Sequence, residues 1–157
     1  MKKFATTKFS FGGASGIITN LAIVIGLDNL SNAKISIIGS LLVVALADNI
    51  SDTLGIHIFQ ESEGLTKREI WISSFTNFLS RFLVSLGFIA IIYFFPINFA
   101  VITSIIYGLL ILSIISYLIS KRKNVNPWQA IAEHITIALV VMFLSHYFSN
   151  FIVGLFG

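Results

Sequence analysis

Apolar residues occur along the chain in five long runs that are separated by short polar connections. The runs cover residues 11–28, 35–60, 69–95, 98–119 and 127–156. A helix needs about 20 mostly apolar residues to cross the hydrocarbon core of a bilayer. The pattern therefore predicts an all-α membrane protein, with one transmembrane domain over residues 1–157 and five transmembrane helices. The first run is the least apolar, because it contains Gly12, Gly13, Ser15, Gly16 and Asn20.

The connections contain signals for the ends of helices. Thr66 and Glu69 have the spacing of a capping box, which predicts a helix start there. Asn126 precedes Pro127, a cap residue before a proline at the first helical position, so the last helix is expected to begin at this point. Pro96 lies between the third and fourth runs and fits a tight turn.

The composition is consistent with lipid as part of the solvent. Hydrophobic residues make up 56% of the chain and charged residues 11%, and the mean hydropathy is +0.93. Soluble domains carry about 25% charged residues. The chain has no cysteine, which excludes disulfides, thiolate metal sites and thiol redox chemistry. No phosphate-binding glycine loop, zinc motif or nucleophile elbow is present, so we expect neither an enzyme nor a bound cofactor.

The distribution of basic residues predicts the orientation. With five spans, the side that holds the N-terminus receives Lys2, Lys3, Lys8, Lys67, Arg68, Lys121, Arg122 and Lys123, and the other side receives Lys34 alone. Lysine and arginine are enriched in cytoplasmic connections. The N-terminus is therefore predicted in the cytoplasm and the C-terminus outside, in a multi-pass protein of a cell inner membrane or an organelle membrane. Basic residues placed in this way indicate a lipid bilayer as the partner and no nucleic acid.

Two carboxylates lie within the second run. Asp48 and Asp52 are four residues apart, so they share one face of a helix, and Asn49 borders that face. A charged side chain near the centre of a spanning helix costs roughly 2.5–3.5 kcal/mol on insertion scales, and its presence requires a reason. Hard divalent cations prefer oxygen ligands of this kind, and paired carboxylates can equally carry protons. Asp48 and Asp52 are thus candidate metal ligands.

The alternative is that the same carboxylates have a structural role. Arg81 lies near the middle of the third run, on a polar stripe with Ser74, Asn77 and Ser85. The second and third helices should be antiparallel neighbours, so Arg81 can neutralise one aspartate in a structural ion pair. Because two aspartates face one arginine, one carboxylate would still be left for protons, water or a cation.

A second group of ionisable residues is expected near the cytoplasmic ends of the helices. It comprises His57, Glu61, Glu63 and Glu133, which can gather cations at an entrance. Solvated helix ends and ordinary interfacial residues explain the same positions. On the opposite side, Asp28 is expected at the outer membrane boundary and His146 in the outer interface.

Small residues are concentrated in the first run. Gly12 and Gly16 have the four-residue spacing that allows two helices to approach closely. A face for self-association is one hypothesis for this pattern.

Two blocks of sequence resemble the vacuolar iron transporter family. The stretch 15–26, Ser-Gly-Ile-Ile-Thr-Asn-Leu-Ala-Ile-Val-Ile-Gly, is similar to the first helix of that family. The stretch 47–52, Ala-Asp-Asn-Ile-Ser-Asp, is similar to its second-helix signature, and Leu54-Gly55 and Glu61-Ser62-Glu63 continue the likeness. The resemblance implies a homodimeric transporter that moves iron(II) or manganese(II) out of the cytoplasm, coupled to protons. It also implies a path between the subunits lined by the first two helices, with Asn20, Asp48, Asn49 and Asp52 along it.

The chain departs from the family pattern at positions that would handle metal. Ser15 stands where the family has an aspartate, Val44 replaces an acidic residue, and Asp52 replaces a methionine. The glutamate-rich cytoplasmic insert after the second helix is also absent, because only a short loop joins Glu63 to Thr66. One interpretation is that the ligand set has moved to Asp48, Asn49 and Asp52, which favours manganese or protons. The alternative is a non-transporting scaffold or accessory subunit with a structural Asp–Arg pair.

Overall fold

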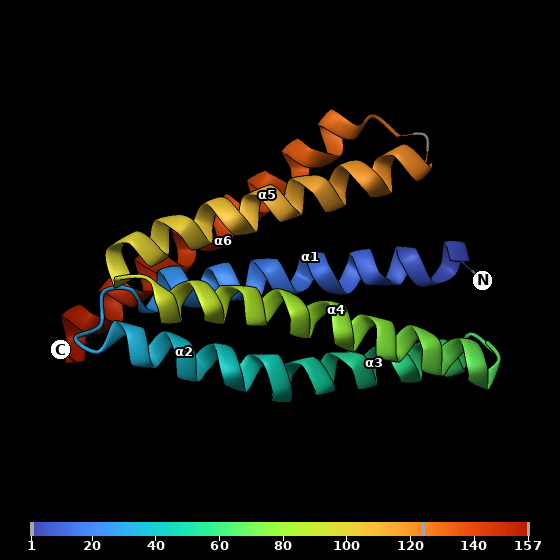
Figure 1. The fold of residues 1–157 in the computed structure, drawn as a ribbon, viewed down its shortest axis with the longest axis horizontal. Coiled ribbons are helices and arrows are strands. Elements are labelled where there is room, and N and C mark those ends of the chain that lie inside the picture. Colours follow the sequence, from blue (N-terminus) through green and yellow to red (C-terminus); the bar gives the residue numbers. More distant parts are fainter. Residues whose placement is uncertain (1, 124, 157) are drawn as a thin grey trace.

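The computed structural model describes the backbone of residues 2–123 and 125–156, and the side chains from Gly12 onward within those ranges. The helices are α1 (Lys2–Leu27), α2 (Ala33–Val43), α3 (Asn49–Ser62), α4 (Lys67–Phe94), α5 (Ile97–Lys123) and α6 (Pro127–Phe156). A π-helical turn, Val44–Asp48, joins α2 to α3 without a break, so Ala33–Ser62 is one rod. The described residues contain no strand, and five rods pass back and forth along one axis (Figure 1). The all-α prediction is confirmed.

Two helix ends differ from the predicted ends by a turn or more. Helix α1 begins at Lys2 rather than near residue 11, so the polar N-terminal residues continue the helix. Helix α5 continues to Lys123 rather than ending at 119, and its last turn holds Lys121, Arg122 and Lys123. Cations at this position are stabilised by the helix dipole, and that explains the extension.

The predicted caps are present. The Thr66 side chain accepts from the Glu69 amide, and the Glu69 carboxylate accepts from the Thr66 amide, which completes the capping box at the start of α4. At the start of α6, the Trp128 amide donates to Asn126 Oδ1 at 3.1 Å. Gly64, with φ of 69°, occupies the left-handed region directly after α3 and lets the chain reverse.

Four of the rods are long and apolar enough to cross a membrane: Ala33–Ser62, α4, α5 and α6. Their outward surfaces are covered by large apolar side chains such as Phe75, Ile106 and Phe143, as lipid contact requires. Within the described side chains of α1, the segment Gly12–Leu27 is apolar but shorter than a full span.

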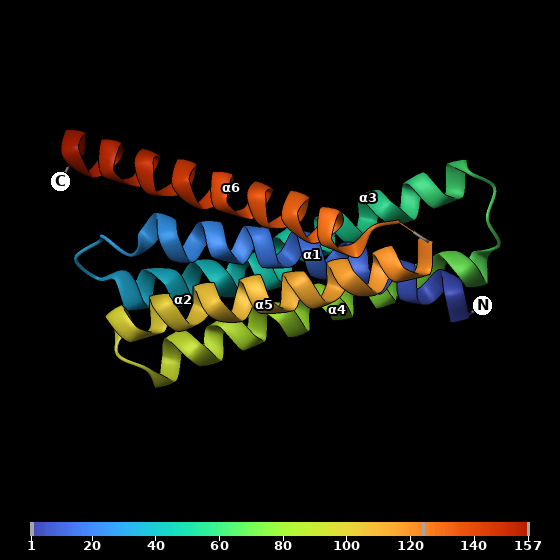
Figure 2. The same ribbon diagram turned by 90° about the horizontal axis from the view of Figure 1, so that it is seen from above.

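Helix α1 is surrounded by the other helices (Figures 1 and 2). It contacts α2, α4, α5 and α6, and Ile17, Asn20, Leu21 and Val24 on it are fully buried. A helix that faces protein rather than lipid does not need an apolar surface on every side. The central position of α1 therefore accounts for its weak hydropathy. Helix α6 lies at one edge instead and is largely exposed (Figure 2).

The ends of the bundle differ in charge. The N-terminus, the turn between α3 and α4 and the start of α6 lie at one end, and the C-terminus lies at the other (Figure 1). The first end carries Lys67, Arg68 and the basic last turn of α5, while the second carries Lys34. This arrangement agrees with the predicted orientation, with the N-terminal end in the cytoplasm.

The glycine spacing in α1 serves contacts inside the chain. A Cβ on Gly12 would lie 2.7 Å from Ser80 Oγ and closer still to Asn77 Oδ1, and one on Gly16 would lie 3.5 Å from the backbone of Arg81. The face proposed for self-association is thus occupied by α4 of the same chain. Close approach of α1 and α4 is the reason for these small residues.

Candidate functional site

A charged cluster lies at mid-height of the bundle. Asp48 is the sixteenth of 30 residues in the rod Ala33–Ser62, and Arg81 is the fifteenth of 28 in α4. Ser15 is the fourteenth of 26 in α1. Three separate helices therefore contribute polar side chains to the depth at which a membrane is least tolerant of them.

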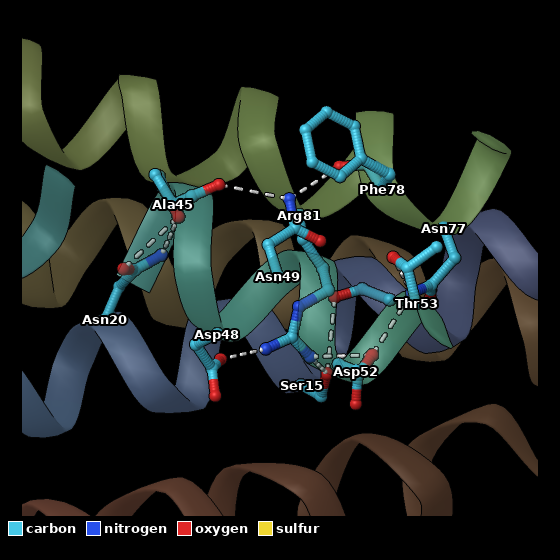
Figure 3. Close-up of polar contacts among 12 residues, drawn as sticks. Ser15, Asn20, Ala45, Asp48, Asn49, Asp52, Thr53, Asn77, Phe78 and Arg81 are labelled. Atoms are coloured by element: carbon cyan, nitrogen blue, oxygen red, sulfur yellow. Dashed lines mark hydrogen bonds and ion pairs between the residues drawn. The ribbon is translucent and has the colours of Figure 1, made fainter. Parts of the chain in front are cut away.

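Arg81 joins the three helices. Its Nη2 is 2.6 Å from Asp48 Oδ2 and its Nη1 is 3.3 Å from Asp52 Oδ2, and Nη1 also donates to Ser15 Oγ (Figure 3). Asn77 Nδ2 donates to the same Asp52 oxygen at 3.1 Å. The ion pair expected from the sequence is therefore formed, and it involves both aspartates rather than one.

The two carboxylates differ from the arginine in exposure. The Arg81 side chain is 6% exposed, whereas those of Asp48 and Asp52 are 49% and 32% exposed. The second oxygen of each aspartate is turned away from Arg81 (Figure 3). With both carboxylates ionised, the cluster carries one negative charge in excess, on oxygens at the surface of the bundle.

The π-helical turn immediately precedes this cluster. The Asn49 amide donates to the Leu46 carbonyl, three residues back, and to the Val44 carbonyl, five residues back, instead of to Ala45. The Asn49 side chain compensates, because its Nδ2 donates to Ala45 O at 3.3 Å and to Phe78 O on α4 at 2.9 Å. Asn49 thereby fixes the rod to α4 at the point where Asp48 and Asp52 are presented. Single π-turns of this type are frequent at functional sites.

Polar contacts continue from the cluster toward the cytoplasmic end, between α3 and α4. Asn77 Nδ2 lies 3.3 Å from Thr53 Oγ1, His57 Nδ1 lies 3.1 Å from Ser74 Oγ, and Gln60 Nε2 donates to Ser73 Oγ at 2.8 Å. Gln60 and Ser73 are both buried. Thr53, Gln60 and Ser73 were not predicted from the sequence. The helical spacing of Thr53, His57 and Gln60 would have revealed the two on α3.

Asn20, which the resemblance places along a path, contacts α4 in the structure. It is fully buried between α1 and α4, where its Nδ2 donates to Ser85 Oγ at 2.9 Å. The Ser85 hydroxyl also lies 3.4 Å from Asn20 Oδ1. The pair holds α1 against the outer half of the polar stripe of α4.

The residues predicted at a cytoplasmic entrance do not all come together. His57 Nε2 is 3.7 Å from Glu61 Oε1, and the His57 ring packs edge-on against Trp71. Glu63 is exposed at the end of α3. Glu133 is exposed on α6, where its Oε1 accepts from Gln129 Nε2 at 3.3 Å. Glu61 thus accompanies His57, Glu63 lies at the end of the same helix, and Glu133 belongs to a separate helix.

Metal binding within one chain is limited by the number of ligands. Among the side chains that the structure describes, no group of three or more His, Cys, Asp or Glu residues is arranged to hold a metal ion. Asp48 and Asp52 supply two carboxylates, and Arg81 already occupies one oxygen of each. A divalent ion bound here would need further ligands from water or from another chain.

No protein-family model, curated protein or solved structure matches the chain. The architecture itself defines the class: the chain is an all-α membrane protein whose apolar helices are suited to multiple passes.

Proposed function

We propose that the protein is a membrane transporter for divalent cations, iron(II) or manganese(II), with Asp48 and Asp52 as the central ion-binding carboxylates. The observation that carries the proposal is the shared guanidinium of Arg81 between two half-exposed carboxylates at mid-height. A structural ion pair would need only one of them. The excess carboxylate charge supplies a binding site for a cation or for protons, which is what coupled exchange requires.

Arg81 has a defined part in this mechanism. It keeps one oxygen of each aspartate fixed and leaves the other oxygen free. When a cation binds to the free oxygens, the charge of the cluster changes sign without exposing Arg81. When protons replace the cation, the Arg81 contacts still hold the carboxyl groups in position. The path therefore operates with the cation and protons in alternation, and it leads out of the cytoplasm.

A homodimer is part of the proposal. Carboxylate oxygens exposed to hydrocarbon at mid-height are unfavourable, so this surface needs a cover. A second copy would cover it and bring two more carboxylates to the same depth, giving four in total. Carboxylate oxygens suit manganese(II) best among the proposed ions. His57, Glu61 and Glu63 would gather cations at the cytoplasmic end of α3, and Glu133 would do so from α6.

A structural role is the second candidate, and one observation favours it. The Arg81 side chain is almost fully buried and contacts Asp48, Asp52 and Ser15, so it ties together three helices. A scaffold or accessory subunit could use this network for stability alone.

Metal uptake into proteoliposomes distinguishes the two candidates. We expect uptake of Fe²⁺ or Mn²⁺ by the wild type, and no uptake by the Asp48→Ala/Asp52→Ala variant after its folding has been verified. Ser113→Ala in α5 is the control, because the Ser113 hydroxyl donates to the Leu109 carbonyl of its own helix and has no part in the proposed path. Absence of flux for Fe²⁺, Mn²⁺ and Co²⁺, with and without a proton gradient, would reject transport and favour the structural candidate.

A further inference from the structure

Four polar residues that are far apart in the sequence meet at the outer end of the bundle. Asp28 and Asn29 follow α1, and His146 and Asn150 lie on α6. Asn29 Nδ2 donates to Asn150 Oδ1 at 2.7 Å, and Asn150 Nδ2 lies 2.9 Å from His146 Nε2. The amide orientation makes Asn150 the donor to Nε2, so a neutral His146 carries its proton on Nδ1.

The carboxyl group of Asp28 is incompletely satisfied at this position. Its Oδ1 is buried without a hydrogen-bond partner in the described part of the chain. Burial raises the pKa of Asp28 above its ordinary value of 3.8, while the charge of His146 and the backbone amides of Asn29 and Asp28 oppose the rise. A buried acceptor without a donor is satisfied when the carboxyl group takes up a proton or meets water.

Other charged and titratable groups at this end have different partners. Lys34, at the start of α2, donates from Nζ to the Phe95 carbonyl at 3.2 Å. Tyr93 packs against Phe94, and Tyr147 against Phe148. His146 is the side chain whose charge acts on Asp28.

We propose that Asp28 and His146 form a proton-binding site at the outer end of the bundle, in which the Asp28 carboxyl group exchanges protons with external water. The proton binds to an Asp28 oxygen, and the nearby His146, oriented by Asn150 and Asn29, adjusts the affinity. If the protein is the proposed transporter, this site is the external entry for the protons that exchange with the cation, and that role rests on the proposed function. Proton binding at Asp28 does not depend on transport.

Carbon-13 NMR tests the site directly, because Asp28, Asp48 and Asp52 are the three aspartates in the chain. Protein labelled at aspartate Cγ and reconstituted in nanodiscs is titrated, and Asp28→Asn assigns the resonance. We expect the Asp28 midpoint to lie above 3.8. In His146→Gln it should move further up, because the opposing charge is removed.

His134→Gln is the matched control. His134 also lies on α6, but its Nδ1 is 2.7 Å from Ser116 Oγ, nearer the cytoplasmic end. This variant should leave the Asp28 midpoint unchanged. A wild-type midpoint at or below 3.8, or a midpoint that His146→Gln does not move, would overturn the proposal. Because the titration requires no flux, a failure of the transport proposal is distinguishable from a failure of this site.

Discussion

Helices α4 and α5 are both long apolar rods with serines on their buried faces, but they use their polar groups differently. Ser73, Asn77, Arg81 and Ser85 of α4 bond to side chains of α1 and α3. In α5, Thr103, Ser113, Ser116 and Ser120 donate to carbonyl oxygens four residues back in the same helix. A hydroxyl that satisfies itself locally can lie anywhere in a membrane helix. A polar group that needs a partner on another helix fixes the packing.

The difference sets the candidate site apart from the rest of the bundle. The interhelical bonds of α4 converge on two carboxylates that remain partly exposed. Helix α5 contributes buried contacts such as Ala100 and Leu112, and its contact with His134 through Ser116 is isolated from the central cluster. Polar content alone therefore does not identify a site, whereas bonds between helices do.

The largest expected effect comes from breaking the polar network of α4. Arg81→Ala would leave Asp48 and Asp52 without a counter-ion, and should destabilise the protein by at most about 3–5 kcal/mol, toward the lower end because Asp48 is half exposed. Unfolding in detergent micelles measures the change. Asp48→Asn and Asp52→Asn, added to Arg81→Ala, should restore much of the stability.

Ser113→Ala in α5 is the comparison for this experiment, because the Ser113 hydroxyl bonds only its own helix in the structure. Its effect should be within about 0.5 kcal/mol, as for changes that remove no needed partner. Equal losses in the two helices would contradict the distinction drawn between them.

A smaller effect is expected where α1 approaches α4. Gly12→Ala would place a methyl group against Ser80 and against Asn77, which cannot move freely because it bonds Asp52 and Thr53. Overpacking of this kind costs about 1–3 kcal/mol. Gly39→Ala is the control: a Cβ there meets nothing within 4 Å, and thermal unfolding should show no loss of stability. A Gly12→Ala protein as stable as the wild type would show that the contact is loose.

The smallest effect concerns the outer end. The folded-state pKa of Asp28 is raised, so the folded protein binds this proton more tightly than the unfolded chain does. Stability should therefore fall as pH rises from the ordinary value of 3.8 through the folded-state pKa. Asp28→Asn should raise the melting temperature at pH 7, and the difference should vanish in acid. A lower melting temperature at pH 7 would contradict this sign.

Much of the fold could be predicted from the sequence, because the relevant signals are local. Apolar runs, the Thr66 capping box and the Asn126-Pro127 start gave five rods and their order. The start of α1 at Lys2 was missed because polar residues outside the apolar run can continue a helix. The central place of α1 could not be predicted, since weak hydropathy is equally consistent with a poor span and with a buried one.

The candidate site was partly predictable for the same reason. The spacing of Asp48 and Asp52 and the stripe that includes Arg81 are helical patterns visible in the chain. The π-helical turn at Val44–Asp48, directly before the pair, is predicted by no simple pattern. The sharing of one guanidinium between both carboxylates depends on how α4 packs against this rod. The meeting of Asp28 with His146 depends on how α6 packs beside α1, a long-range property.

Cation flux through Asp52→Asn tests the central claim most directly. This variant keeps the Asp48–Arg81 pair at 2.6 Å and removes the excess negative charge. If Asp52 carries function, the purified variant should remain folded in the bilayer, while Fe²⁺ or Mn²⁺ uptake into proteoliposomes falls to the level of empty vesicles. Uptake equal to that of the wild type would contradict the claim that the excess carboxylate binds the transported ion.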